Sequence, residues 1–251
     1  MKLYPKSKLG HSLFRIFGTV FLVSALFIVA MRTTEYFTLL YYKKNPELIM
    51  KDIPFYTVIE KHDPALFSQI RQDIKEALDN QTPPKLLKVK VRAYLDKVLS
   101  EKLPSTSNQA IINYMSVTVQ EMQSLQQQGY GLCHKFLYPK PGQLVDLTQY
   151  VPSSLIDQDL SSLTEVIRNA YENPSEVPTV QEVRPLLKQV YDALEKQYGV
   201  EVQALMRPLD EYTNKDTVCA MTIAMFQEIL KLPVEQGGQT FRFLVLKNNG
   251  S

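Results

Sequence analysis

Two cysteines and three histidines are the residues of this chain whose side chains most often carry chemistry. Cys133 and His134 are adjacent in the segment GYGLCHKF, where a thiol could meet a neighbouring general base. Neighbouring side chains on a strand point to opposite faces, so adjacency is poor evidence for a catalytic pair and favours a disulfide cysteine beside a surface histidine. His11 lies in a basic tail, which leaves His62 and His134 for the rest of the chain.

The remaining motifs supply no metal or catalytic centre. The sequence has no H-E-x-x-H, C-x-x-C, G-x-S-x-G or glycine-rich phosphate loop. The DQD at 157–159 lacks the glycine and distal glutamate of a calcium loop and is typical of the acidic first turn of a helix. The NQT at 80–82 fits a glycosylation sequon, which matters only in a eukaryotic secretory pathway. We therefore expect no cofactor and no metal.

Charge is divided unevenly along the chain. Residues 1–32 carry five basic and no acidic residues, whereas residues 33–251 carry 23 basic and 26 acidic residues. The main part of the chain is therefore mildly acidic. Because phosphate binding needs clustered Lys and Arg, this balance argues against a nucleic-acid surface.

The segment RIFGTVFLVSALFIVAMR places sixteen uncharged residues between Arg15 and Arg32. Extended outward to Leu13, the apolar stretch has 19 residues, enough for a helix to cross the hydrocarbon core while Arg15 extends to the interface. A helix buried in a soluble core is the first alternative, but the segment has no polar face. Cleavage after Ala25 or Ala30 is the second. Six apolar residues follow Ala25, and an isoleucine occupies a position before Ala30 where a small residue is favoured. We interpret the segment as an uncleaved, single-pass signal anchor.

The flanks of this segment favour a cytoplasmic N-terminus and an extracytoplasmic main domain, periplasmic if the source is bacterial. The two sides nearly tie in basic residues, but a short tail with that charge density is harder to translocate than the long C-terminal part. Aromatic residues directly beyond the segment are typical of a belt at the headgroups, or of the apolar face of a continuing helix. The predicted membrane-interface residues are Arg15, Arg32, Tyr36, Phe37, Tyr41 and Tyr42.

Apolar residues at helical spacing predict a mostly α-helical domain. Asp63 and Pro64 are typical of a helix start, and Thr179 with Glu182 fits a capping box, although Pro185 either kinks that helix or marks its true beginning. The segment after Lys215 is apolar almost all round, as in a helix at the centre of a fold. The predicted helices span about 63–80, 85–103, 109–128, 154–172, 179–198 and 215–232.

Four segments favour strands, and they predict a small antiparallel sheet near the C-terminus. They are FYTVIE, LCHKFLY, Gly199–Leu205 and Thr240–Lys247. The fold class expected is thus mostly α, with one N-terminal transmembrane helix and a small sheet. The expected layout is a basic tail at 1–12, a signal anchor at 13–32, a juxtamembrane segment at 33–51 and one domain at 52–251.

The two cysteines connect location with structure. In an oxidising compartment, a Cys133–Cys219 disulfide would close a long loop and stabilise the fold by roughly 4 kcal/mol. The alternative is two unrelated buried thiols, since free cysteine is often a core residue. In a cytoplasmic domain we would expect no bridge.

Two classes of function fit these observations. In the first, which we favour, the chain is held in the lipid bilayer and its helical domain binds a protein partner or organises an envelope complex without catalysis. In the second, a membrane-tethered enzyme or ligand-binding domain brings polar residues together only in three dimensions. A pocket lined by His134 and carboxylates would favour the second class. A cytoplasmic domain on the same anchor differs from both in orientation alone.

Overall fold

The computed structural model describes residues 54–80, 82, 94, 97–129, 131–139, 145, 147–209 and 214–246. The predicted tail, membrane span and juxtamembrane segment at 1–51 lie outside the described residues. So does about half of the predicted helix at 85–103, of which residues 94 and 97–103 are described and helical. Within the described ranges, no helix combines the length and the apolar character that a membrane crossing requires.

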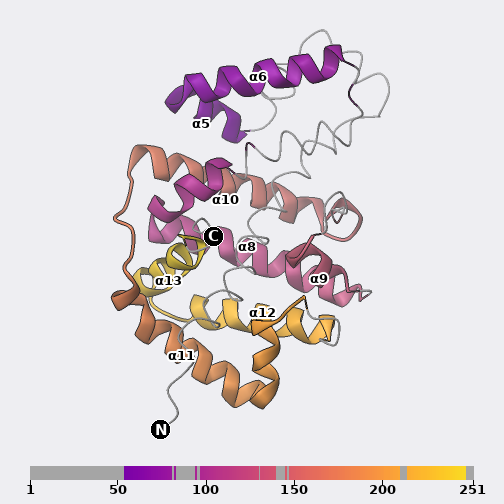
Figure 1. Cartoon of the computed structure of the whole chain (residues 1–251), viewed down its shortest axis with the longest axis vertical. Helices are drawn as coiled ribbons and strands as arrows, with labels where there is room; N and C mark the ends of the chain where they lie inside the picture. The colour runs from indigo at the N-terminus through magenta and orange to yellow at the C-terminus, as the bar shows by residue number, and fades with distance from the viewer. Residues whose placement is uncertain are drawn as a thin grey trace.

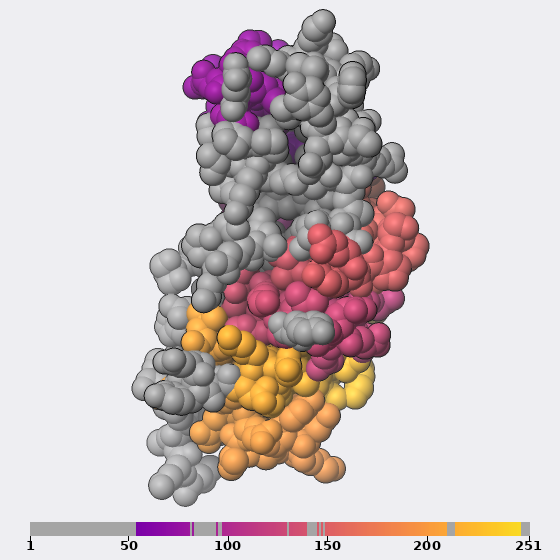
Figure 2. Space-filling view, turned by 90° about the vertical axis from the view of Figure 1, so that its right-hand side faces the viewer, coloured from indigo at the N-terminus to yellow at the C-terminus, as the bar shows by residue number. Residues whose placement is uncertain are grey.

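The described elements are α-helices and short 3-10 helices, labelled α and η, arranged in layers along the long axis (Figure 1). Helix α10 separates the α5–α6 hairpin from α8, and α12 separates α8 from α11. Figure 2, turned by 90°, keeps α6 and α11 at opposite ends of the molecule. In chain order the elements are α5 (Pro54–His62), α6 (Pro64–Asp79), η2 (Leu103–Ser105), α8 (Asn108–Gln127), α9 (Leu132–Leu137), η3 (Leu147–Gln149), α10 (Ser153–Glu172), α11 (Val180–Tyr198), η4 (Gly199–Met206), α12 (Lys215–Leu230) and α13 (Val234–Leu246).

Helices α8 and α12 form the centre of the fold. Helix α8 packs against α9, α10, α12 and α13, and its buried positions extend around most of its circumference. Helix α12, predicted to be central because it is apolar almost all round, packs against α8, α9, α11, α13 and η4. The largest fully buried side chains include Tyr114 of α8 and Phe226 of α12. Although α8 is rich in glutamine, only a narrow strip of its surface is exposed.

Several predicted helix ends are confirmed. Asp63 caps α6 by accepting a 3.0 Å hydrogen bond from the Leu66 amide, with Pro64 at the first helical position. Thr179 and Glu182 form a complete capping box for α11. This helix begins before Pro185 and contains it, which decides between the two alternatives left open by the sequence. Gly199, with φ of 58°, follows its last residue.

The predicted small antiparallel sheet is wrong, because all four strand-like segments are helical in the described chain. FYTVIE belongs to α5, LCHKFL is α9, Gly199–Met206 is η4, and 240–246 belongs to α13. β-Branched and aromatic residues favour strands only weakly, and burial on several sides overrides that preference. In α13 the consecutive residues 240–245 are all buried, so a short apolar run could not distinguish a strand from a helix packed on most sides.

Helix α13 is positioned by one glycine, Gly238, and one arginine, Arg242. Gly238 lies so close to Asn108 that an added Cβ atom would be 2.4 Å from the Asn108 Cβ. The buried Arg242 guanidinium donates to Asn108 Oδ1 at 3.0 Å, to the Pro104 carbonyl at 3.1 Å and to the Glu176 carbonyl at 2.8 Å. Arg242 thereby connects α13 with η2, the start of α8 and the segment between α10 and α11.

Candidate functional site

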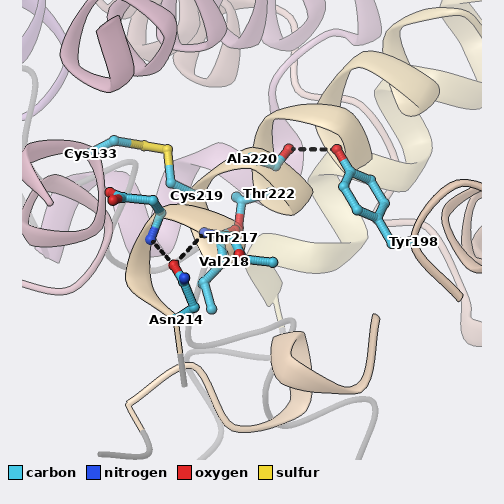
Figure 3. The surroundings of a disulfide bond; sticks show 9 residues. Cys133, Tyr198, Asn214, Thr217, Val218, Cys219, Ala220 and Thr222 are labelled. Atoms are coloured by element: carbon cyan, nitrogen blue, oxygen red, sulfur yellow. Dashed lines mark hydrogen bonds between the residues drawn. A yellow bond between two sulfur atoms is a disulfide. The ribbon is translucent and has the colours of Figure 1, made fainter. Parts of the chain in front are cut away.

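The Cys133–Cys219 pair lies where α9 meets α12 (Figure 3). The two sulfur atoms are within bonding distance, and the Cα atoms are 5.9 Å apart, a separation typical of a disulfide. Both residues are almost completely buried, at 2% and 1% exposure. The structure therefore brings together the two cysteines that the sequence suggested as partners, although 86 positions separate them.

Local sequence places each cysteine. Gly129 and Gly131 adopt positive φ values of 70° and 61°, a conformation that few other residues accept, and so turn the chain sharply from α8 into α9. On the other side, Asn214 caps α12, because its Oδ1 atom accepts hydrogen bonds from the Asp216 and Thr217 amides at 3.0 and 3.1 Å (Figure 3). Cys219 follows in the second turn of that helix.

His134 is a buried residue, which corrects the prediction of a surface histidine. It is 7% exposed, and its Nε2 atom lies 2.9 Å from the Pro208 carbonyl oxygen, to which it donates a hydrogen bond. Its ring also contacts Tyr138, with the ring centroids 4.9 Å apart. Burial lowers the pKa of His134 below its ordinary value of 6.5, so the neutral ring is favoured. With Cys133 bonded to Cys219 and His134 bonded to the main chain, this pair has the geometry of a structural contact.

A pair of buried carboxyl groups was missed by the sequence reading. Glu121 of α8 is 0% exposed and Asp159 of α10 is 1% exposed. Neither Glu121 oxygen has a hydrogen-bond partner among the described residues. Burial, together with the charge of Asp159, raises the pKa of Glu121 well above its ordinary value. The two acids therefore meet within the packed interface between α8 and α10.

Asp159 also corrects the interpretation of DQD as an acidic first turn. Helix α10 begins at Ser153 after Pro152, so Asp157 and Asp159 lie in its second turn. Asp157 is exposed whereas Asp159 lies on the buried stripe with Leu155, Ile156 and Leu163. Helical spacing could have shown this, because Asp159 falls three and four residues after two apolar positions of that stripe.

A third polar group joins α5 to the end of α10. Lys61 Nζ and His62 Nε2 lie 2.7 and 3.1 Å from the same Glu172 oxygen. The His62 ring stacks on Tyr171 with centroids 5.3 Å apart, and the Lys102 ammonium lies 4.3 Å from the centroid of the Tyr171 ring. Hydrogen bonds from Lys61 and His62 lower the pKa of Glu172. These contacts connect the end of α5 with the end of α10.

These positions form no metal centre in the part of the chain that the structure describes, where no three His, Cys, Asp or Glu side chains gather as ligands. The predicted membrane-interface residues all lie outside the described residues: Arg15, Arg32, Tyr36, Phe37, Tyr41 and Tyr42. The candidate site is therefore the predicted Cys133–Cys219 pair, together with the buried His134 beside it.

The chain matches no protein-family model, no curated protein and no solved structure.

Proposed function

We propose that this protein is a single-pass membrane protein whose helical domain lies outside the cytoplasm and binds a protein partner there. The domain would be held near the bilayer by the apolar segment at 13–31, which has basic residues on both sides. The partner would be a component of the membrane or of the envelope.

The Cys133–Cys219 pair is the observation that carries the proposed location. Disulfides persist in oxidising compartments and are rare in the cytosol of most organisms. Two core cysteines at the Cα separation of a disulfide can stabilise a domain through that bond only where the bond persists, which favours a domain that folds outside the cytoplasm. The pair thus supports the same orientation that the basic N-terminal tail supports by an independent argument.

The geometry around His134 supports a binding role over catalysis. Its Nε2 atom is bonded to the Pro208 carbonyl, and the nearby charges that act on it are those of Lys215 and Asp216 at the start of α12. The adjacent thiol is bonded to Cys219. For Cys133 to act as a nucleophile and His134 as a base, both the disulfide and the hydrogen bond to Pro208 would have to break. The arrangement instead favours a structural role, in which these bonds hold α9 and the chain after η4 in place as a rigid surface.

Exposed apolar side chains indicate where a partner should first be sought. Val200 in η4 is 82% exposed and Leu209, three residues after that element, is 58% exposed. Single exposed apolar residues are common on proteins and do not by themselves show an interface. We therefore use these two only as the first positions to probe. They belong to the part of the chain that follows α11, at the end of the molecule opposite α6 (Figure 1).

A photo-crosslinking amino acid in the full-length, membrane-bound protein tests this proposal. At position 200 it should give one discrete adduct with another membrane or envelope protein, and Val200→Asp in a chain probed at Leu209 should reduce that adduct. The matched control is the same probe at Lys75, an exposed position of α6. Adducts that are equally strong from positions 200 and 75, or absent from both Val200 and Leu209, would contradict a partner that contacts these two residues.

A further inference from the structure

The interface between α8 and α10 contains an acid on each side. Glu121 follows the apolar stripe of α8, with Val117 four residues before it and Leu125 four residues after it, and both neighbours are buried. Asp159 occupies the equivalent place on α10, between the buried Leu155 and Leu163. Two carboxyl groups at core positions of facing helices repel each other when both are ionised.

Glu121 gains no compensation for its burial from the described residues. Both of its oxygens are inaccessible to water and lack a hydrogen-bond donor there. A carboxylate buried in this way is costly, whereas the protonated form carries no charge. Of the described groups, Asp159 is the one whose charge acts on Glu121, and it acts in the same direction as burial.

The other buried ionisable groups on the helices against α8 are engaged elsewhere. His134 of α9 bonds to Pro208, and the charges that act on it include those of Lys215 and Asp216 of α12. Arg242 of α13 bonds to Asn108, which precedes Glu121 by thirteen positions, or about 20 Å along a helix.

The buried tyrosine hydroxyls do not supply a charge either. Burial raises the pKa values of Tyr56 in α5, Tyr138 after α9 and Tyr171 in α10 above their ordinary value, so all three remain neutral near physiological pH. None of the three phenol oxygens has a hydrogen-bond partner in the described part of the chain.

We propose that the α8–α10 interface is a pH-sensitive contact, which is tight while Glu121 carries a proton and loosens as that proton is lost. Helix α10 also carries α5, the first described helix after the predicted anchor. Loosening would therefore change how the end of the domain that includes α5 and α6 is held against the part that contains the disulfide. Given the location proposed above, the pH outside the membrane would control this change.

The direction of the effect follows from linkage. An unfolded chain loses the Glu121 proton near pH 4.5, whereas the folded chain retains it to higher pH. The contribution of Glu121 to the free energy of unfolding is therefore greatest below pH 4.5. Between pH 4.5 and the folded-state pKa, the folding equilibrium constant falls by up to about tenfold for each pH unit.

Denaturant unfolding of the full-length protein in mild detergent at pH 5.0 and pH 7.5 tests the proposal. Glu121→Gln keeps the shape without the charge, and Glu121→Met provides a second, apolar variant if the amide is poorly accommodated. At least one of them should be more stable than the wild type at pH 7.5. In that variant, the ratio of the folding equilibrium constant at pH 5.0 to that at pH 7.5 should be at least tenfold smaller than in the wild type. Asp157→Asn, an exposed acid two residues before Asp159, is the matched control and should behave as the wild type.

Hydrogen exchange at pH 7.5 locates the effect. Amides of α8 and α10 should exchange more slowly in the stabilised Glu121 variant than in the wild type, at the same pH. The proposal is overturned if both variants keep the wild-type pH profile, or if both are less stable than the wild type at pH 5.0 and 7.5 alike. The second result would mean that ionisation of Glu121 at pH 7.5 does not oppose the packing of α8 against α10.

Discussion

The imidazole Nε2 atom of His134 lies 2.9 Å from the Pro208 carbonyl oxygen and donates a hydrogen bond to it, which fixes the chain after η4 against α9. Because the preceding residue is bonded to Cys219 in α12, two adjacent residues of a six-residue helix hold two distant segments. Helix α9 thus acts as a structural junction.

His134 should make the domain less stable as the pH falls. Burial lowers its pKa from 6.5, so the unfolded chain binds a proton more readily than the folded chain does. The contribution of the neutral ring is complete above about pH 6.5 and is lost as the pH decreases through the lower folded-state value. The free energy of unfolding, measured from pH 7.5 to 5.5, should fall more steeply for the wild type than for His134→Gln. Parallel profiles would contradict this assignment. The difference between wild type and variant also removes the contribution of Glu121, which has the opposite sign.

Removal of the cysteine pair should destabilise the domain substantially. Cys133 and Cys219 close a loop with a sequence separation of 86, for which the chain-entropy model gives about 4.6 kcal/mol. The double variant Cys133→Ala/Cys219→Ala should lose an amount of that order in denaturant unfolding. Reductant should destabilise the wild type and leave the double variant unchanged. A wild type that is insensitive to reductant under unfolding conditions would show that the bond is absent.

Gly238→Ala should destabilise the protein although alanine is the better helix former. Helix propensity alone would favour the variant by about 1 kcal/mol. The added Cβ atom would lie 2.4 Å from the Asn108 Cβ and 2.5 Å from its Cα, so α13 must move away from α8. Overpacking of this kind costs about 1–3 kcal/mol, which exceeds the gain in propensity. Thermal unfolding should therefore show a lower midpoint than the wild type, while Gln236→Ala on the exposed side of α13 should not. A stabilised Gly238→Ala protein would contradict the close contact.

Arg242→Met should weaken the packing of α13 more than its loss of charge suggests. The guanidinium donates to Asn108 Oδ1 and to two carbonyls from other segments, and these acceptors would remain buried without their donor. We expect a loss of about 3 kcal/mol in the free energy of unfolding. Arg242→Lys should recover part of it, because a lysine can reach fewer of the acceptors. The control is Arg184→Met on the exposed face of α11, which should change stability little. Equal effects of the two methionine variants would contradict a role for Arg242 in joining these segments.

Local signals in the sequence predicted the helices whose ends depend on a few neighbouring residues. Asp63 before Pro64, and Thr179 before Glu182, satisfy free amides within one turn, so the pattern needs no distant contact. The α-helix at 215–230 was also predictable, because an apolar residue at nearly every position requires burial on most sides.

Features that depend on distant packing could not be predicted in the same way. The run from Thr240 to Leu246 has the composition of a strand, and it becomes a helix because η2, α8, α11 and α12 surround it. Glu121 has the appearance of an exposed helix residue, and its burial follows from α10 lying across it. The pairing of Cys133 with Cys219 was predicted only because the chain contains no other cysteine.

The central claim, an anchored chain with its domain outside the cytoplasm, is tested most directly by fusing two reporters after Ser251. One reporter is an enzyme active only outside the cytoplasm, and the other is active only inside it. We predict activity from the first alone, with the fusion retained in membranes after a carbonate wash. Activity from the second alone, or release of the fusion by the wash, would contradict the account.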